Sequence, residues 1–488
     1  MKTSKMIVTG VAIALFACGS SVYAQKGKAE KKPAYEVKFI MQQGMPDSVL
    51  YVAYYYADKT YMFDTLYVER KVPYTFIMKG DSARMERGMY ILAAESKVKY
   101  LDFLVDSSFF FTIKVGNTKE STVYINSPEN TLIGEFEKGM TTYYSKGQPL
   151  VEVLRTNESL SEDEKEKLRA EIKLCQDSMQ LFRTDFLQKH ESTLFAKIIR
   201  MGEDIANSIP DPPRNPDGTI VDSAWSYQYY LHHYWDNTDL SEPALLRTPS
   251  TFYQRLTYYF DNVVMPIPDT INKYVDLLIE RVKHPDLLRY IIQYITHKYE
   301  TSQYVGHDAV FVHMVKKYYE KGSCPWVDEE VLKALIERAN HLDLILIGRV
   351  APYLVMPDTN GAYRSNYDFN KKYTIMWFWD LNCGHCKTAT PILKEFYDRA
   401  KDSLDFEVYA VCMGTDTVKW KQAIIEKGLN WINVGKNTAN IDFREVYGVT
   451  TTPVVFIIDR EKKIIAKKIE AKEIENVIRN HEAGKRIR

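Results

Sequence analysis

The sequence is short of the residues that would mark several protein classes. Six cysteines in 488 residues are too few for a disulfide-rich secreted scaffold. The 22 glycines and 19 prolines are fewer than a largely disordered or collagen-like chain would need. Basic and acidic residues both number 64, so no excess charge favours nucleic acid as a partner. At this length we expect several folded domains.

Long apolar runs are also missing after residue 24, and no later stretch approaches the roughly 18 apolar residues of a membrane helix. Residues 1–24 have the pattern of an export signal, with two lysines, an apolar segment and small residues at the end. We therefore predict a signal peptide over 1–24 and a mature protein in the periplasm or cell envelope. Residues 15–18 form a weak lipobox-like pattern, so a lipoprotein anchored through Cys18 is the alternative.

The rest of the chain divides into three predicted domains according to its hydrophobic periodicity. Residues 25–130 contain short alternating segments separated by turns, which predict an antiparallel β-sandwich-like domain. Residues 131–346 have helical periodicity, and Ser161 with Glu164 forms a capping-box pattern at the start of one amphipathic helix. Residues 347–488 alternate between strands and helices, which predicts an α/β domain.

The clearest chemical signal lies in residues 373–391, YTIMWFWDLNCGHCKTATP. The apolar run at its start is typical of a strand that is buried on both faces of a sheet. Apolar residues then recur at helical spacing, so Cys383 and Cys386 lie at or just before the N-terminus of a helix. The helix dipole stabilises a thiolate there, and two thiols at this spacing can close into a reversible disulfide.

The other cysteines and the histidines carry weaker signals. Cys175 and Cys412 fall on apolar stripes and are interpreted as core residues, whereas Cys324 lies in a turn without a predicted partner. His232 and His233 are adjacent, and adjacent side chains on a helix diverge, which argues against a metal site. Zinc binding by the paired cysteines would need a second pair of ligands at suitable spacing, and none follows. A thiol peroxidase would need only one reactive cysteine, so the paired motif argues against that class of enzyme.

The 347–488 region resembles the thioredoxin fold, in the envelope branch typified by ResA and TlpA. The matching positions at the active-site strand and helix are Trp379, Cys383, Cys386, Lys387 and Pro391. Downstream, Thr452 and Pro453 precede an apolar strand and match the cis-proline loop of this family. The two earlier domains resemble, in pattern only, the β domain and helical spacer that often precede envelope thioredoxin-like domains.

The resemblance implies a thiol-disulfide oxidoreductase whose only redox group is its Cys383–Cys386 disulfide, with no bound cofactor and no metal. Cys383 would attack a substrate disulfide as a thiolate, and Cys386 would resolve the mixed disulfide. Thr452 and Pro453 would orient an extended substrate segment. His385 would tune the couple to a potential between about −270 and −180 mV.

The implied partners are protein thiols and disulfides, in a role in cell redox homeostasis. A reductase would also require an envelope electron donor, whereas an oxidase or isomerase would not, and the direction of electron flow stays open. The chain departs from the family pattern at two positions. Ala389 replaces a glutamate, which leaves Asp380 as the nearest substitute acid to accept the Cys386 proton, and Asn382 replaces an aromatic residue. The alternative is an envelope protein that binds a partner or a glycan, with an auxiliary or regulatory redox domain.

Overall fold

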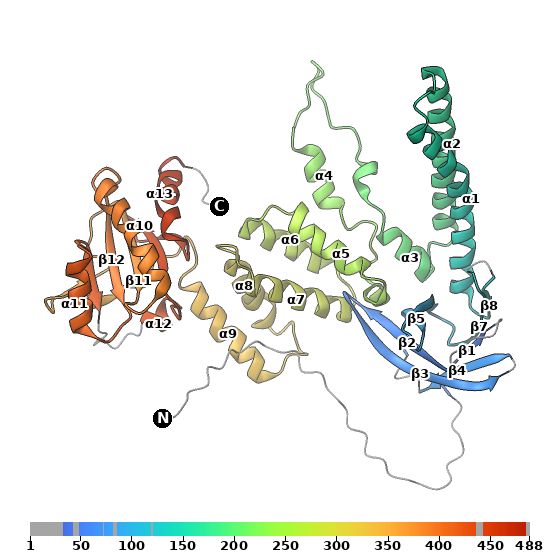
Figure 1. Cartoon of the computed structure of the whole chain (residues 1–488), viewed down its shortest axis with the longest axis horizontal. Coiled ribbons are helices and arrows are strands. Elements are labelled where there is room, and N and C mark those ends of the chain that lie inside the picture. Colours follow the sequence, from blue (N-terminus) through green and yellow to red (C-terminus); the bar gives the residue numbers. More distant parts are fainter. Residues whose placement is uncertain are drawn as a thin grey trace, which may run out of the picture.

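The computed structural model describes residues 33–41, 48–71, 73–81, 85–118, 121–435 and 443–484. The predicted signal peptide and Cys18 lie outside these ranges. Among the described residues, no helix combines the length and apolar character needed to span a bilayer. Figure 1 shows a β region at one end of the molecule, a helical region in the middle and an α/β region at the other end. The predicted fold class is thus confirmed.

The N-terminal strands form one sheet in the order β6-β5-β2-β3-β4-β1-β7-β8. They are β1 Tyr35–Met41, β2 Val49–Tyr56, β3 Lys59–Lys71, β4 Tyr74–Gly80, β5 Gly88–Ala94, β6 Lys99–Val105, β7 Phe110–Val115 and β8 Val123–Ile125. Neighbouring strands are antiparallel, except that β1 and β7 are parallel.

One apolar core contains side chains from β1 to β7, and it requires the sheet to curve. The ring centroids of Phe39 in β1 and Phe103 in β6 lie 5.3 Å apart, although β5, β2, β3 and β4 separate these strands in the sheet. The sheet therefore folds over into a half-barrel. The two facing halves that a sandwich would draw from separate sheets come here from one continuous sheet.

The middle of the chain is helical, as predicted. Its α-helices are α1 Pro128–Thr156, α2 Glu162–Lys189, α3 Leu194–Met201, α4 Trp225–His233, α5 Thr251–Tyr258, α6 Pro268–Arg281, α7 Pro285–Glu300, α8 Asp308–Met314 and α9 Glu329–Asp343. Shorter turns are η1 Ile205–Ser208 and η2 Pro243–Arg247, with π-helical turns η3 Tyr259–Val263 and η4 Val315–Tyr319. The predicted capping box at Ser161 and Glu164 begins α2, and α1 and α2 form a projecting hairpin (Figure 1).

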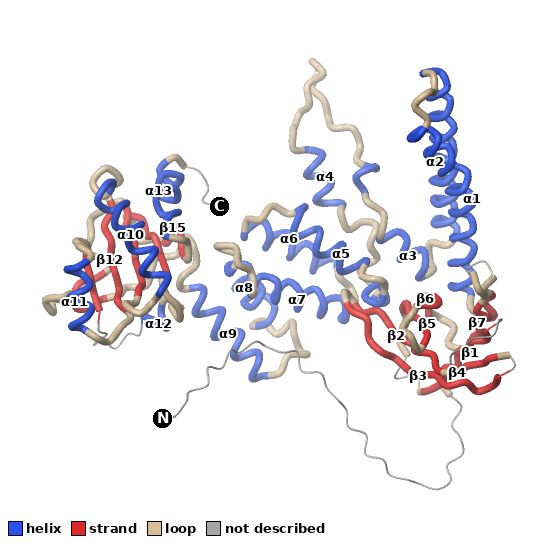
Figure 2. Tube along the Cα trace, viewed as in Figure 1, coloured by secondary structure: helices blue, strands red, loops and turns tan. Residues whose placement is uncertain are grey.

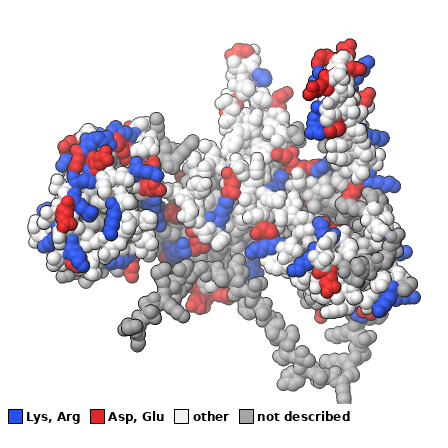
Figure 3. All heavy atoms as spheres, viewed as in Figure 1, with Lys and Arg blue, Asp and Glu red and all other residues white. Residues whose placement is uncertain are grey.

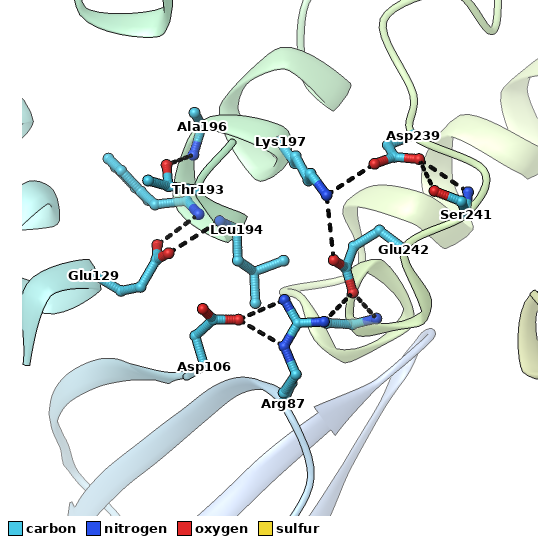
Figure 4. A network of polar contacts seen from close by, with 12 residues as sticks. Arg87, Asp106, Glu129, Thr193, Leu194, Ala196, Lys197, Asp239, Ser241 and Glu242 are labelled. Atoms are coloured by element: carbon cyan, nitrogen blue, oxygen red, sulfur yellow. Dashed lines mark hydrogen bonds and ion pairs between the residues drawn. The ribbon is translucent and has the colours of Figure 1, made fainter. Parts of the chain in front are cut away.

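Ion pairs around the buried Glu242 carboxylate join the β region to the helical region (Figure 4). Arg87 bonds to Asp106 in the β region and reaches Glu242 at 3.0 Å, next to η2. Lys197 of α3 lies 3.4 Å from the other carboxylate oxygen of Glu242. Nearby, the Glu129 carboxylate in the first turn of α1 accepts hydrogen bonds from the first two backbone N–H groups of α3. The first two regions are thus connected by specific polar contacts as well as by apolar packing.

The C-terminal region is a five-stranded mixed sheet in the order β13-β12-β11-β14-β15. Its strands are β11 Tyr373–Trp379, β12 Phe406–Cys412, β13 Ile432–Gly435, β14 Val454–Asp459 and β15 Ile464–Lys467. Its helices are α10 Gly384–Ala400, α11 Thr417–Glu426, α12 Phe443–Val446 and α13 Ile474–Glu482, with η5 Ala471–Glu473, and the short strands β9 Val355–Pro357 and β10 Tyr363–Ser365 pair with each other.

Every residue of β11 is buried, as the apolar run predicts. Trp377 and Trp379 enter the core beneath α10 and α13, whereas Met376 and Phe378 enter the core on the opposite face. The central strand therefore ends, at Trp379, directly before the two cysteines. On the face drawn in Figure 3, acidic and basic side chains are interspersed over this region, in keeping with the balanced charge of the sequence.

Candidate active site

Cys383 is the N-cap residue of α10, as the helical spacing predicts. Its sulfur accepts a hydrogen bond from the backbone N–H of Cys386 at 3.1 Å. Partial burial acts to raise the pKa of the Cys383 thiol, but the hydrogen bonds it receives, Cys386 among the donors, outweigh burial and lower the pKa. A half-exposed sulfur with a lowered pKa is suited to act as a nucleophile.

Cys386 has the opposite environment, in the first turn of α10. Its side chain is only 2% exposed and packs in the core beneath α10. Burial raises the pKa of its thiol, and the hydrogen bond to the neighbouring Cys383 sulfur adds to that effect. The helix therefore holds one accessible sulfur and one protected sulfur side by side.

The Thr452–Pro453 loop lies against the first cysteine, although 69 residues separate the two in sequence. The Cys383 thiol donates a hydrogen bond to the backbone oxygen of Thr452 at 3.2 Å. The peptide bond between Thr452 and Pro453 is cis. The structure thus brings together the two motifs that the sequence places far apart.

A groove of about 580 Å³ runs beside the two motifs. His385, Ala389 and Ile392 of α10 form one side, and the loop from Gly448 to Val454 contributes to its lining. Residues 468–472, between β15 and α13, complete the lining. His385 lies between the two cysteines in sequence, and Pro453 follows the residue that contacts Cys383. An extended segment of another chain in the groove would therefore pass close to the cysteine pair.

The other predicted residues surround the pair at different depths. Trp379 is buried, and its backbone pairs with Cys412 of β12. Lys387 is exposed, and its backbone N–H donates to the Cys383 carbonyl at 3.3 Å. Pro391 lies inside α10. Trp379 and Pro391 therefore belong to the strand and the helix that hold the site, whereas the Lys387 side chain faces solvent.

The positions that depart from the family pattern also lie at the site. Asn382 is exposed, and its backbone N–H donates to the Asp380 carboxylate at 2.8 Å. Ala389 lines the groove on the side formed by α10, and the lining residues from that helix include no acid. Asp380 is half-buried directly before the cysteines, where its backbone oxygen accepts a hydrogen bond from the Cys383 N–H.

Residues 468–472 are functional candidates that the sequence did not single out. The stretch reads KIEAK, and this polar composition is ordinary for a surface loop. Only the return of β15 beside β14 brings it to the groove, because the Lys468 N–H donates to Val455 at 2.7 Å, two residues after the cis-proline. No local pattern could have indicated that contact.

Of the other described cysteines, Cys175 and Cys324 lie in the helical region, and Cys412 of β12 lies in the core that also contains Cys386. Cys412 and Cys324 are buried, as core residues, and Cys175 is half-buried against Gly147 of α1. His233 bonds to Asp236 at 2.6 Å, and His232 bonds to a backbone carbonyl of its own helix. Among the described residues, no group of three or more metal-ligating side chains converges.

Two family models match this chain, and one of them covers the site. A model of the thioredoxin-like family matches residues 370–464, which contain both cysteines and the Thr452–Pro453 loop. A second model, for a domain of unknown function (DUF5106), matches residues 211–341 in the helical region.

Individual relatives each match about a quarter of this chain. The thiol-disulfide oxidoreductase ResA of Bacillus thuringiensis subsp. konkukian is 28% identical over 120 residues, which are 24% of this chain and 67% of the relative. A domain of a possible thiol-disulfide isomerase from Cytophaga hutchinsonii is 36% identical, with a TM-score of 0.27, over 28% of this chain and 95% of that one. The thioredoxin domain of a thiol-disulfide oxidoreductase from Bacteroides vulgatus is 31% identical, with a TM-score of 0.26, over 28% and 96%.

Proposed function

Because the chain is a thioredoxin-like thiol-disulfide oxidoreductase of the TlpA/ResA type, we propose that it is exported and exchanges disulfides with protein substrates through Cys383 and Cys386. The observation that carries this proposal is the unequal pair at the start of α10. Cys383 is accessible with a lowered pKa, and Cys386 is buried with a raised pKa. Thiol-disulfide exchange needs this order of reactivity, since the first thiol must attack the substrate and the second must react only after the mixed disulfide has formed.

In the reducing direction, the Cys383 thiolate attacks one sulfur of a substrate disulfide. A Cys383–substrate bond forms, the substrate S–S bond breaks, and one substrate thiolate leaves. Cys386 then gives its proton to the departing thiolate and attacks the Cys383 sulfur, which releases the second substrate thiolate. The protein ends as the Cys383–Cys386 disulfide, oxidised by two electrons, and the substrate gains those electrons. The oxidising direction is the reverse of these steps.

The groove supplies the place for the substrate chain. In the resting structure the Thr452 carbonyl accepts a hydrogen bond from the Cys383 thiol. Once the sulfur reacts, this carbonyl becomes available to a backbone N–H of an extended substrate. His385 lines the same groove, where an imidazolium favours the thiolate and makes the disulfide more oxidising. These contacts involve backbone and sulfur, so recognition tolerates different substrate sequences.

Export is proposed from the leader pattern of residues 1–24. A protein disulfide is a more stable substrate in an oxidising compartment than in the cytosol. Fractionation of cells that produce the full chain tests this part, because an exported protein is released with the envelope fraction and lacks the leader by mass.

The turbidity that develops as dithiothreitol reduces insulin reports the rate of disulfide reduction, so it tests the proposed thiol-disulfide exchange. We expect the wild-type chain to accelerate reduction and Cys383→Ser to abolish the acceleration, because the attacking sulfur is gone. Cys386→Ser should instead accumulate a mixed disulfide between Cys383 and insulin, visible on a non-reducing gel, because the resolving sulfur is missing.

Cys412→Ser is the matched control, since it removes a buried thiol from the same core while both site sulfurs stay in place. We expect it to retain activity. Wild-type protein without activity, or a Cys383→Ser variant that remains active, would refute the proposed mechanism.

A further inference from the structure

Lys467 is a buried cation at the edge of the C-terminal sheet. It ends β15, the outermost strand, and yet is only 2% exposed. Its ammonium donates to the carboxylate of Asp308, the first residue of α8, and to the Ile345 carbonyl at 2.7 Å. An ammonium is expensive to bury without such partners, so this pairing is a specific contact between the helical region and the C-terminal region.

The backbone beside this ion pair joins the same two regions. The segment after α9 runs antiparallel to β15, and the Gly348 N–H donates to Ile464 at 2.7 Å. The Ile464 N–H donates in return to Arg349 at 2.8 Å. β15 is therefore held on one side by β14 and on the other by the chain that leaves the helical region. In Figure 2, β15 lies on the side of the sheet that faces the helices.

The groove wall begins at the next residue. Lys468 has a left-handed backbone with a φ of 55° and turns the chain sharply out of β15. Residues 468–472 then form the wall that lies across from His385 and Pro453. Ile345 also lies close to Gly448, which lines the groove, since its Cδ1 would be 3.7 Å from a Cβ added to that glycine. The Lys467 ammonium thus fixes the base of this wall to a carboxylate of another region.

We propose that the Asp308–Lys467 contact positions the 468–472 wall of the groove, so that the helical region takes part in the recognition of protein substrates. Asp308 and Lys467 are positioning residues, because neither reaches the reacting sulfurs. A protein disulfide must bring its flanking backbone into the groove, whereas a small disulfide needs only access to Cys383. The inference rests on the proposed function, and it predicts that the two kinds of substrate respond differently.

The test uses full-length Asp308→Ala and Lys467→Met, each assayed with two disulfides. We expect the KM for insulin to rise roughly tenfold, the size of a typical coupling between sites. We expect kcat for insulin and the single-turnover rate of the reduced protein with Ellman's reagent to stay near wild type. A general loss of structure would instead lower both activities together, so the KM-against-kcat split separates positioning from folding.

Two further variants complete the experiment. Lys372→Met removes an exposed ion pair with Glu482 in the same region and should leave the KM for insulin unchanged. Asp308→Asn keeps a side-chain oxygen for Lys467 and should recover most of the wild-type KM. If Asp308→Ala does not fold, Lys467→Met carries the comparison.

An insulin KM that stays at the wild-type value in Asp308→Ala and Lys467→Met, or a parallel loss on both substrates, overturns the inference while the proposed function stands. A wild-type chain that reduces neither disulfide overturns the proposed function and the inference with it. Hydrogen exchange gives a second readout, because the amides of 468–472 should exchange faster in Lys467→Met than in Lys372→Met, and equal rates would contradict positioning.

Discussion

At the scale of single residues, the site depends on the contrast between two sulfurs that are three positions apart. Both have the same chemistry, and only their surroundings differ. The Cys383 sulfur receives a backbone N–H at the end of a helix, whereas Cys386 faces the core below the same helix. Hydrogen bonds to the thiolate lower a pKa and desolvation raises it, so one helical turn produces an attacking thiol and a resolving thiol.

This contrast predicts the order of alkylation. Since the pKa of Cys383 is lowered from its ordinary value, a larger share of it is thiolate at neutral pH, and iodoacetamide should modify it below about pH 8.5. The raised pKa of Cys386 should delay its modification to higher pH. Mass spectrometry of pulse-labelled peptides over a pH series measures both.

Cys324 is the internal control, because burial raises the pKa of its thiol to about 11 and it should stay unlabelled near neutral pH. Modification of Cys386 or Cys324 ahead of Cys383 would contradict the assigned roles.

The residues that the sequence identifies are those with a local signature. Cys383, Cys386 and the Thr452–Pro453 pair belong to short motifs, so they could be predicted and the structure brings them together. Lys467 and the 468–472 wall could not be predicted, because their importance comes from the elements they touch. A lysine in a stretch rich in lysine and glutamate reads as solvent-exposed until the fold places it between two regions.

At the scale of elements, strongly patterned segments could be predicted from the sequence, and weakly patterned segments could not. The apolar β11 and the capped helix α2 were visible in the sequence because burial and capping leave a pattern. β6, KYLDFLV, has no alternating pattern from which to predict it, because its first four residues are at least partly exposed and only its last three are buried. The start of α1 at Pro128 came before the predicted change at 130, since proline and glutamate are favoured in a first helical turn.

The π-helical turn η4 is another element without a sequence signal, and it creates a compact cluster. Asp276 of α6 accepts hydrogen bonds from His313 at 2.8 Å and from Tyr318 at 2.6 Å, and pairs with Lys317 at 2.8 Å. A π turn lets residues five apart share one face, which brings His313 and Tyr318 to the same carboxylate. Burial acts to raise the pKa of Asp276, but these three donors outweigh it and lower the pKa to about 2.

Asp276→Asn should therefore destabilise the helical region in a pH-dependent way. A carboxylate whose pKa is lower in the folded state stabilises the fold above its unfolded value near 3.8, and this stabilisation disappears as the pH falls toward about 2. With allowance for partial exposure, we expect a loss of about 1 kcal/mol in the free energy of unfolding at neutral pH.

Urea unfolding followed by circular dichroism at several pH values checks this prediction. Glu280→Gln, at an exposed position of the same helix, is the control and should change little. A penalty for Asp276→Asn that does not shrink between neutral pH and pH values near 3 would contradict the role assigned to the ion cluster.

At the scale of the whole molecule, the three regions are joined by ion pairs at both boundaries. Arg87, Glu242 and Lys197 connect the half-barrel to the helices, and Asp308 with Lys467 connects the helices to the redox region. The order of the regions could be predicted from periodicity. Their mutual contacts could not, because each contact pairs residues far apart in sequence. The region that carries the two sulfurs is therefore in direct contact with the helical region.

The central claim is that Cys383 and Cys386 form one reversible redox couple. Equilibration of the full chain in buffers of defined redox potential, followed by thiol trapping and mass spectrometry, tests it most directly. The account predicts that both thiols disappear together in a single two-electron transition between about −270 and −180 mV. It also predicts that Cys175, Cys324 and Cys412 remain reduced. Separate titration of the two site thiols, or a disulfide from either of them to another cysteine, would contradict the account.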